Sequence, residues 1–433
     1  MVQDESLKVS VRIMKKIVIM ILIDGLRYDY VNEEVSPFLS SLRDSGMSGI
    51  VRETFAFQLR PAFFAGLYPE TCDIGHLFWY DPRDSPFKFT RKLPMPGEIF
   101  QDEDSTNLLR DFLAEEAKSL ERSKGYSASA HYADTAQIPY ELLQYFGFPE
   151  KYLIWEPKSL PYPTLFDILR QHRLKWLHVG YPTEDQRTGI ISNQFKRRIN
   201  DECSFVFLHF GELDWVGHSE GPSSAERKRV LRNIDSAVEE IFSILERSFG
   251  RVRALIFGDH GMVEVQKTVD IKKELEEIDF RVPKDYIYFL DSTQARFWFK
   301  SRQAEKKVKE TLSNLSNGRI LSKEDYERLR IRYKHNRFGD LYFIVEDNTL
   351  VCPNFFQGSL MVKGMHGYLP EVAGNWATLI ITGTKEKRRL SDCVEMVDLF
   401  PTTLDLLELP IPRSCEGRSF ITNSQSGSNC PDD

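Results

Sequence analysis

Apolar runs of strand length recur along the chain. Residues 17–23 (IVIMILI), 205–210 (FVFLHF) and 254–257 (ALIF) are apolar at almost every position rather than at alternate ones. Successive side chains of a strand point to opposite faces of the sheet, so such runs predict strands that are covered on both faces. The pattern therefore predicts an α/β fold with a largely parallel central sheet between layers of helices.

The segment between the second and third runs has the period of a helix. Ser223 and Glu226 form a predicted capping box at its start, and Gly250 marks its predicted end. Between them, apolar residues recur at the spacing of one helical face, namely at Val230, Leu231, Ile234, Val238, Ile241 and Leu245. A strand, a helix and a strand in succession predict a parallel crossover.

Residues 265–360 have a different pattern. The sequences ARFWFK (295–300) and DLYFIVED (340–347) are typical of half-exposed strands, and QAEKKVKETLSNL (303–315) is typical of a charged amphipathic helix. We therefore expect a small α/β cap inserted in the main domain. The predicted parts are a disordered extension (1–13), a core domain (14–264 and 361–422), the inserted cap (265–360) and a polar tail (423–433).

Net charge and cysteine spacing exclude several classes of protein. The 433 residues have a formal net charge of -7, which gives no sign of a nucleic-acid or membrane binder. The six cysteines lack CxxC spacing, so neither a thiolate metal site nor a disulfide scaffold is indicated. The run 17–23 is too short to span a bilayer and leads into Asp24 without a small-residue cleavage site. We expect a cytoplasmic protein.

Acidic and imidazole side chains follow each of the three predicted strands. Asp24 follows the first, Asp214 and His218 follow the second, and Asp259 and His260 follow the third. The loops beyond the carboxyl ends of parallel strands form the crevice in which open α/β folds bind ligands, so these side chains are expected to converge. Asp and His are ligands for zinc, and two such ions together can hold a reacting phosphoryl group.

Seven motifs in sequence order resemble a known family. They are LIDGLRYDYV, GLYPETCDIGH, WYDP, LDWVGHSEGP, FGDHGM, MHGY and MVDLFPTTLDLLELPIP, the last followed by GRSF. The set resembles the nucleotide pyrophosphatase/phosphodiesterase (type I phosphodiesterase) branch of the alkaline phosphatase superfamily. The resemblance extends from about residue 17 to 420 and is weak across 85–200 and the cap. It implies an alkaline-phosphatase-like three-layer α/β/α sandwich.

The resemblance also implies a cofactor and its ligands. Two divalent metal ions are expected, with zinc as the expected metal. By match of motif, Asp24, Asp259 and His260 would hold one ion. Asp214, His218 and His366 would hold the other. The other histidines are expected to be ordinary polar residues, and His209, inside a predicted strand, is expected to face the core.

The nucleophile is the weakest part of the match. The family attacks phosphorus with a Thr or Ser hydroxyl at the start of a helix. Counting ten residues back from Gly66 reaches Ala56, which has no nucleophilic atom, whereas matching on Thr-Phe reaches Thr54. We favour Thr54 as the nucleophile, with Gln58 and Arg60 as candidate phosphate-binding residues, because an arginine fork can donate to two oxygens.

These observations predict a metal-dependent hydrolase of phosphodiester or pyrophosphate bonds that acts on a small-molecule phosphate ester. The alternatives within the superfamily are a phosphomonoesterase, a phosphonate-ester hydrolase and a phosphotransferase. If Ala56 occupies the nucleophile position, either water attacks directly or the chain is a non-catalytic metal-binding relative. The sequence leaves the oligomeric state open.

Overall fold

A mixed, largely parallel sheet forms the centre of the main lobe. The structure is a computed structural model that describes residues 16–55, 58–93, 103–127, 135, 137–390 and 394–421. Across the sheet, the strands follow the order β17 (Arg388–Arg389), β2 (Met47–Arg52), β16 (Ala377–Thr382), β7 (Val252–Phe257), β1 (Ile17–Ile23), β6 (Cys203–Phe210) and β5 (Lys175–Val179). An eighth strand, β18 (Val394–Glu395), also pairs with β2.

The three predicted strands lie side by side at the centre of this sheet. β1 pairs in parallel with β6 on one side and with β7 on the other, so that Ile19 lies opposite Val206 and Ala254. All seven side chains of β1 are buried, as the apolar run predicted. The predicted parallel crossover between β6 and β7 is therefore confirmed, with β1 between its two strands.

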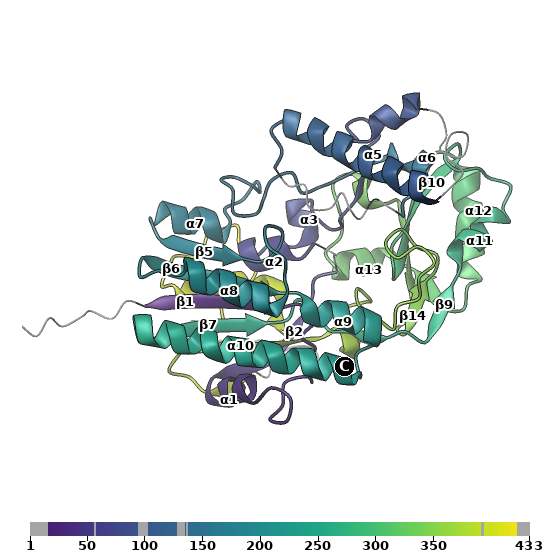
Figure 1. Cartoon of the computed structure of the whole chain (residues 1–433). Coiled ribbons are helices and arrows are strands. Elements are labelled where there is room, and N and C mark those ends of the chain that lie inside the picture. The colour runs from purple at the N-terminus through teal and green to yellow at the C-terminus, as the bar shows by residue number, and fades with distance from the viewer. Residues whose placement is uncertain are drawn as a thin grey trace, which may run out of the picture.

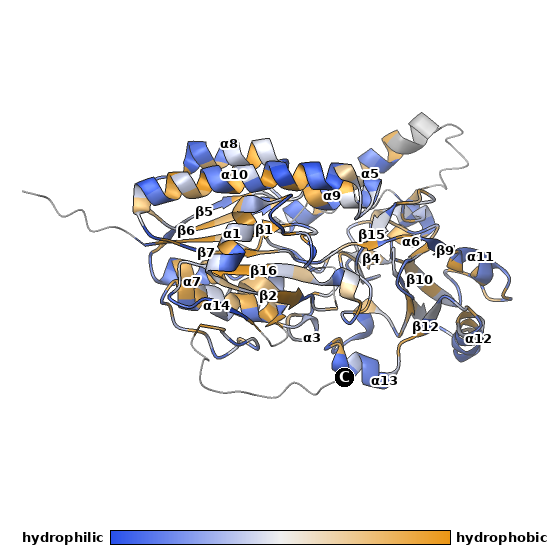
Figure 2. Ribbon diagram, turned by 90° about the horizontal axis from the view of Figure 1, so that it is seen from below, coloured by the Kyte–Doolittle hydropathy of each residue, from blue (hydrophilic) through white to orange (hydrophobic). Residues whose placement is uncertain are grey.

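Helices cover both faces of the sheet, which gives the predicted three-layer α/β/α arrangement (Figure 1). One face is covered by α1 (Pro37–Ser45), α8 (Thr188–Arg198) and α10 (Ala225–Phe249). The other is covered by α2 (Arg60–Ala65), α7 (Leu165–Gln171) and α14 (Leu399–Leu406). Figure 2 shows α8 and α10 with their hydrophobic sides toward the strands and their hydrophilic sides outward.

The predicted start of α10 is wrong by one residue. The N-cap is Ser224 and not Ser223, because the Ser224 hydroxyl accepts a hydrogen bond from the backbone N–H of Arg227 at 3.1 Å. The end of the helix at Phe249, before Gly250, is as predicted. Its apolar stripe, from Val230 to Leu245, lies against the sheet.

A second sheet organises the other lobe (Figure 1). Its antiparallel strands follow the order β10 (Tyr286–Leu290), β11 (Gln294–Phe299), β13 (Leu341–Val345) and β12 (Gly318–Ile320). The helices of this lobe are α5 (Glu103–Ser123), α6 (Tyr140–Leu143), α11 (Ile271–Glu276), α12 (Arg302–Ser313) and α13 (Lys323–Arg328).

The expectation of half-exposed strands in this lobe is wrong. β13 is buried along its whole length, because Leu341 and Phe343 pack into one apolar cluster and Tyr342 and Ile344 pack into another on the opposite face. The first of these clusters also contains residues that precede the predicted cap, among them Phe78. The same cluster thus contains residues from within the predicted cap at 265–360 and from before it.

Short elements connect the two lobes and complete the chain. The strands are β3 (Trp79–Tyr80), β4 (Phe146–Gly147), β8 (Val263–Glu264), β9 (Lys267–Val269), β14 (Thr349–Val351) and β15 (Gly364–Met365). The helices are α3 (Pro69–Cys72) and α9 (Glu212–Glu220), with 3-10 turns η1 (Lys88–Lys92), η3 (Asn336–Phe338), η4 (Ala373–Asn375) and η5 (Met396–Asp398). Among the described helices, none combines the length and the apolar character needed to cross a bilayer. The predicted extension at 1–13 and the tail at 423–433 lie outside the described residues.

Candidate active site

The structure brings the six predicted metal ligands together at one edge of the main sheet. Asp24 follows β1, and Asp259 and His260 follow β7. Asp214 and His218 lie on α9, directly after β6. Because β1, β6 and β7 are parallel, their carboxyl ends meet at this edge. The sixth residue, His366, follows β15, where the chain returns from the second lobe.

Asp24, Asp259 and His260 form the first group, with ligand atoms within 4.8 Å of one another. His260 Nε2 lies 3.2 Å from Asp24 Oδ1 and 3.7 Å from Asp259 Oδ1. His260 Nδ1 donates a hydrogen bond to the carbonyl of Gly261 at 2.8 Å. That bond fixes the orientation of the ring, and Nε2 of the neutral ring is then the atom available to a metal ion.

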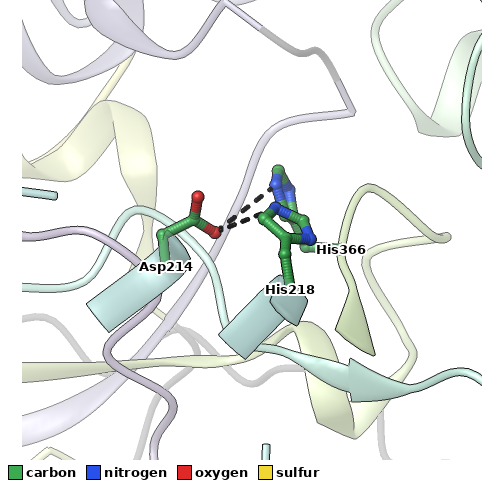
Figure 3. Close-up of side chains that lie close together, drawn as sticks. All are labelled: Asp214, His218 and His366. Carbon is green, nitrogen blue, oxygen red and sulfur yellow. Dashed lines mark ion pairs between the residues drawn. The ribbon is translucent and has the colours of Figure 1, made fainter. Parts of the chain in front are cut away.

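Asp214, His218 and His366 form the second group, again with ligand atoms within 4.8 Å of one another. Asp214 and His218 are four residues apart on α9 and therefore lie on the same face of the helix (Figure 3). Asp214 Oδ1 lies 3.2 Å from His218 Nε2 and 3.8 Å from His366 Nε2. His218 Nδ1 donates to the carbonyl of Gly364 at 2.8 Å, which orients this ring in the same way.

The two groups adjoin. The rings of His260 and His366 stack with their centroids 3.5 Å apart and an angle of 4° between their planes. The ring of His218 lies 5.2 Å from that of His366. One phosphate group could therefore contact ions held by both groups, the arrangement that two-metal phosphoryl transfer needs.

The pKa values of the Asp and His side chains in the two groups depend strongly on burial. Burial raises the pKa of Asp24, but hydrogen bonds with His209 and His260 outweigh it and hold that pKa well below its usual range. Burial and the charge of Asp24 raise the pKa of Asp259 to about 7. Burial lowers the pKa of His366 well below its usual range, so this ring is neutral at pH 7.

Burial lowers the pKa values of His260 and His218, but the neighbouring carboxylates of Asp259 and Asp214 outweigh it and raise both. Zn²⁺ binds neutral imidazoles and carboxylates, so metal binding would release protons from these rings. The same donors accept manganese or iron.

A cavity of about 440 Å³ extends from the two groups. Side chains from both lobes line it, including Leu77, Ser292, Phe356 and Gln357 from the second lobe. Its volume lies within the range of small-molecule sites. All six predicted ligands are among the residues that line this space, which can admit a small substrate.

Gln58 and Arg60, the predicted phosphate-binding residues, also line the cavity. The Arg60 guanidinium pairs with Glu150 at 2.5 Å and donates to Gln58 Oε1 at 3.0 Å. It also lies over the ring of Tyr181, 4.8 Å from the ring centroid. Arg60 is thus held in place within the wall of the cavity by a largely buried ion pair.

The structure does not choose between the two nucleophile alignments. Thr54 follows β2, is 6% exposed and is not among the residues that line the cavity. Its Oγ1 is buried and has no hydrogen-bond partner among the described residues. Ala56 lies outside the described residues. The role of Thr54 therefore stays a prediction.

Sequence reasoning missed three acidic or imidazole residues that line the cavity, namely Glu53, His178 and His209. The expectation that His209 only faces the core is wrong. This residue is 9% exposed, and its Nε2 lies 3.0 Å from Asp24 Oδ2, because it is the second-last residue of β6 and lies beside the end of β1. Gln186 Nε2 lies 3.2 Å from His209 Nδ1. The signal that could have identified His209 is its position at the end of β6, the strand next to the one that Asp24 follows.

The fold and the site together define a three-layer α/β protein with two adjoining Asp/His groups, each of which could hold a metal ion. The sequence model of the family "Type I phosphodiesterase / nucleotide pyrophosphatase" matches residues 18–369. The chain belongs to this family.

Solved structures of relatives have the same fold. Murine ectonucleotide pyrophosphatase/phosphodiesterase 5, as an inactive threonine-to-alanine variant in complex with AMP, matches with a TM-score of 0.65 and 15% identity, over 92% of this chain and 96% of that chain. The human counterpart matches with a TM-score of 0.63 and 15% identity, over 91% and 96% of the two chains. The predicted alkaline-phosphatase-like α/β fold is confirmed.

Matches to curated proteins are local. Ectonucleotide pyrophosphatase/phosphodiesterase family member 7 from Mus musculus is 33% identical over 90 residues, which are 20% of this chain and 20% of that protein. GPI ethanolamine phosphate transferase 1 from Mus musculus is 34% identical over 70 residues, 16% of this chain and 8% of that protein. The chain thus matches a fifth or less of the length of these relatives.

Proposed function

We propose that this protein is a metal-dependent hydrolase of phosphodiester or pyrophosphate bonds, with two zinc ions held by its two Asp/His groups. The observation that carries the proposal is the position of these groups, side by side in the wall of a cavity that both lobes line. Membership of the type I phosphodiesterase / nucleotide pyrophosphatase family supports the reaction class. Bound divalent ions would supply charge neutralisation of the phosphate and activation of the nucleophile.

The chain's own residues have separate parts in the proposed reaction. Thr54 is the proposed nucleophile, and its hydroxyl forms a bond to phosphorus as the bond to the leaving oxygen breaks. Water then cleaves the phosphorus–threonine bond. Gln58 and Arg60 orient the substrate from the cavity wall, where the Glu150 pair fixes the guanidinium.

Zinc content and substrate choice test this proposal. We expect about two zinc ions per chain and turnover of p-nitrophenyl thymidine phosphate well above that of p-nitrophenyl phosphate. Activity should disappear with EDTA and return with zinc. A folded protein with two bound zinc ions and no turnover of either ester would contradict the catalytic part.

Substitution of Thr54 tests the nucleophile separately. Thr54→Ala should lower kcat by several orders of magnitude, as the loss of a nucleophile does, whereas Thr54→Ser should keep part of it. Unchanged turnover in Thr54→Ala would remove this hydroxyl from the reaction and favour direct attack by water.

A phosphotransferase is the second candidate, because 70 residues resemble a GPI ethanolamine phosphate transferase. In that case an alcohol and not water would accept the group from the protein. Turnover in the presence of ethanolamine or glycerol distinguishes the two candidates. A transferase would form the phosphoalcohol in excess of the hydrolysis product, and a hydrolase would not.

A further inference from the structure

Glu53 is a carboxylate of the cavity that the six proposed ligands do not include. It directly follows β2, is 7% exposed and lines the cavity together with Asp259 and His260. β2 and β7 are both antiparallel to β16, which lies between them, so β2 and β7 run in the same direction. The residue after β2 therefore reaches the same edge of the sheet as the residues after β7.

The surroundings of Glu53 do not satisfy its charge. Its Oε1 is buried and has no hydrogen-bond partner in the described part of the chain. Burial raises the pKa of Glu53 to about 8; the charge of His260 lowers this pKa and the charge of Asp259 raises it. An unpartnered buried carboxylate oxygen is destabilising unless a ligand or ion contacts it.

The two groups differ in the number of carboxylates around them. Asp24 and Asp259 form the first group with a single imidazole, that of His260, and Glu53 lines the same cavity. The second group has one carboxylate and two imidazoles. A zinc site takes four ligands when it is closed, and the first group offers three. A divalent cation there would gain a ligand and give the third carboxylate its missing partner.

We propose that Glu53 is a further ligand of the metal ion that Asp24, Asp259 and His260 hold. The inference rests on the proposed function, because it requires an ion at this group. Glu53 is not one of the three residues whose ligand atoms lie within 4.8 Å of one another, so its side chain turns toward the ion on binding. The first group then offers four protein ligands and the second offers three, and a five-coordinate ion at the first group still has a position for a phosphate oxygen.

Zinc affinity tests the inference without reference to activity. Zinc is titrated into the metal-free protein in competition with a chelator, for the wild type, Glu53→Gln and Glu53→Asp. Glu53→Gln should lower the zinc affinity of the tighter site by at least about tenfold and leave the zinc affinity of the weaker site unchanged. Tenfold is the lower end of the loss seen when a residue that only supports a metal ligand is removed. Glu53→Asp should restore part of the loss. Glu121→Gln, the same change at a buried carboxylate that pairs with Lys151 and does not line the cavity, is the control and should leave both affinities unchanged.

Cobalt provides a second measurement, because the visible absorption of Co²⁺ depends on its ligands. The cobalt-loaded wild type and Glu53→Asp should differ in their spectra, which keeps the test decisive even if Glu53→Gln does not fold. Unchanged zinc affinities in a folded Glu53→Gln, or identical cobalt spectra, would overturn the inference and leave the proposed function intact. A wild type that binds no zinc or cobalt would overturn both.

Discussion

At the scale of single residues, His209 holds a proposed ligand in place. Its ring contacts Asp24 Oδ2, while His260 lies beside Oδ1. His209→Ala should therefore lower zinc affinity about 10- to 100-fold, because the carboxylate loses the partner that orients it. His209→Gln should lose less, since an amide can still donate. Zinc titration measures the effect, with His172→Ala at an exposed position as the control.

His178 should make the fold sensitive to acid. Burial is the main cause that lowers its pKa from 6.5 to about 3. The unfolded chain therefore binds a proton between pH 6.5 and 3 that the folded chain does not, so stability falls as pH falls through this window. The loss should reach about 2 kcal/mol at pH 5.

Denaturant unfolding at pH 7 and pH 5 measures this effect. His178→Gln removes the titrating ring, so the variant should lose less stability than the wild type between the two pH values. Equal losses would show that His178 does not titrate in the expected way.

The sequence identified the six proposed ligands because each lies in a motif, five of them directly after a long apolar run. Glu53 could not be found in this way. It follows β2, whose sequence MSGIVR is not an apolar run, because this strand lies near the edge of the sheet and four of its six residues are only partly buried. A site residue at a strand end can thus be predicted from the sequence only when the strand before it can be predicted.

At the scale of elements, the N-cap of α10 allows a matched comparison. Ser224→Ala removes the hydroxyl that accepts from the N–H of Arg227 and should cost about 1 kcal/mol of the free energy of unfolding. Ser223→Ala, one residue earlier, should stay within about 0.5 kcal/mol. Equal losses in urea unfolding would mean that the cap in solution is not the one described.

Strands were predictable where both faces are covered. β1, β6 and β7 lie at or next to the centre of the sheet and were found from their apolar runs. β5 ends the sheet and begins with the exposed Lys175, so its pattern resembles that of a surface segment. The exposed start of β5 thus explains why this edge strand was missed, whereas β16 was missed although it lies inside the sheet and is buried at five of its six residues.

At the scale of the whole molecule, a buried ion pair joins the second sheet to the segment before it. Arg296 on β11 pairs with Asp291 at 2.8 Å and donates to the carbonyl of Phe78 at 2.9 Å. Arg296→Met would leave Asp291 buried without its cation, which should cost about 3–5 kcal/mol. The double variant Arg296→Met/Asp291→Leu should recover most of that loss in urea unfolding, and an equal loss would contradict the role of the pair.

Lobe boundaries were harder to predict than strands. Phe78 and Phe146 pack into the same apolar cluster as β10 and β11, although they precede the predicted cap by more than a hundred residues of chain. Hydrophobic periodicity shows that a residue is buried but not which cluster it joins, so the boundaries drawn from the sequence stay predictions. The cytoplasmic location and the expected absence of nucleic-acid and membrane partners also stay predictions.

His260 and His366 lie where the chain leaves the main sheet and where it returns, and their rings stack. Ions at the two groups would therefore fasten both ends of this excursion, as a reversible cross-link closes a long loop. Limited proteolysis should cut the segment around the exposed Leu360 and Met361 faster after chelation than in the zinc-loaded protein. The same ions would then serve as catalytic cofactors and would also hold the second lobe against the main sheet.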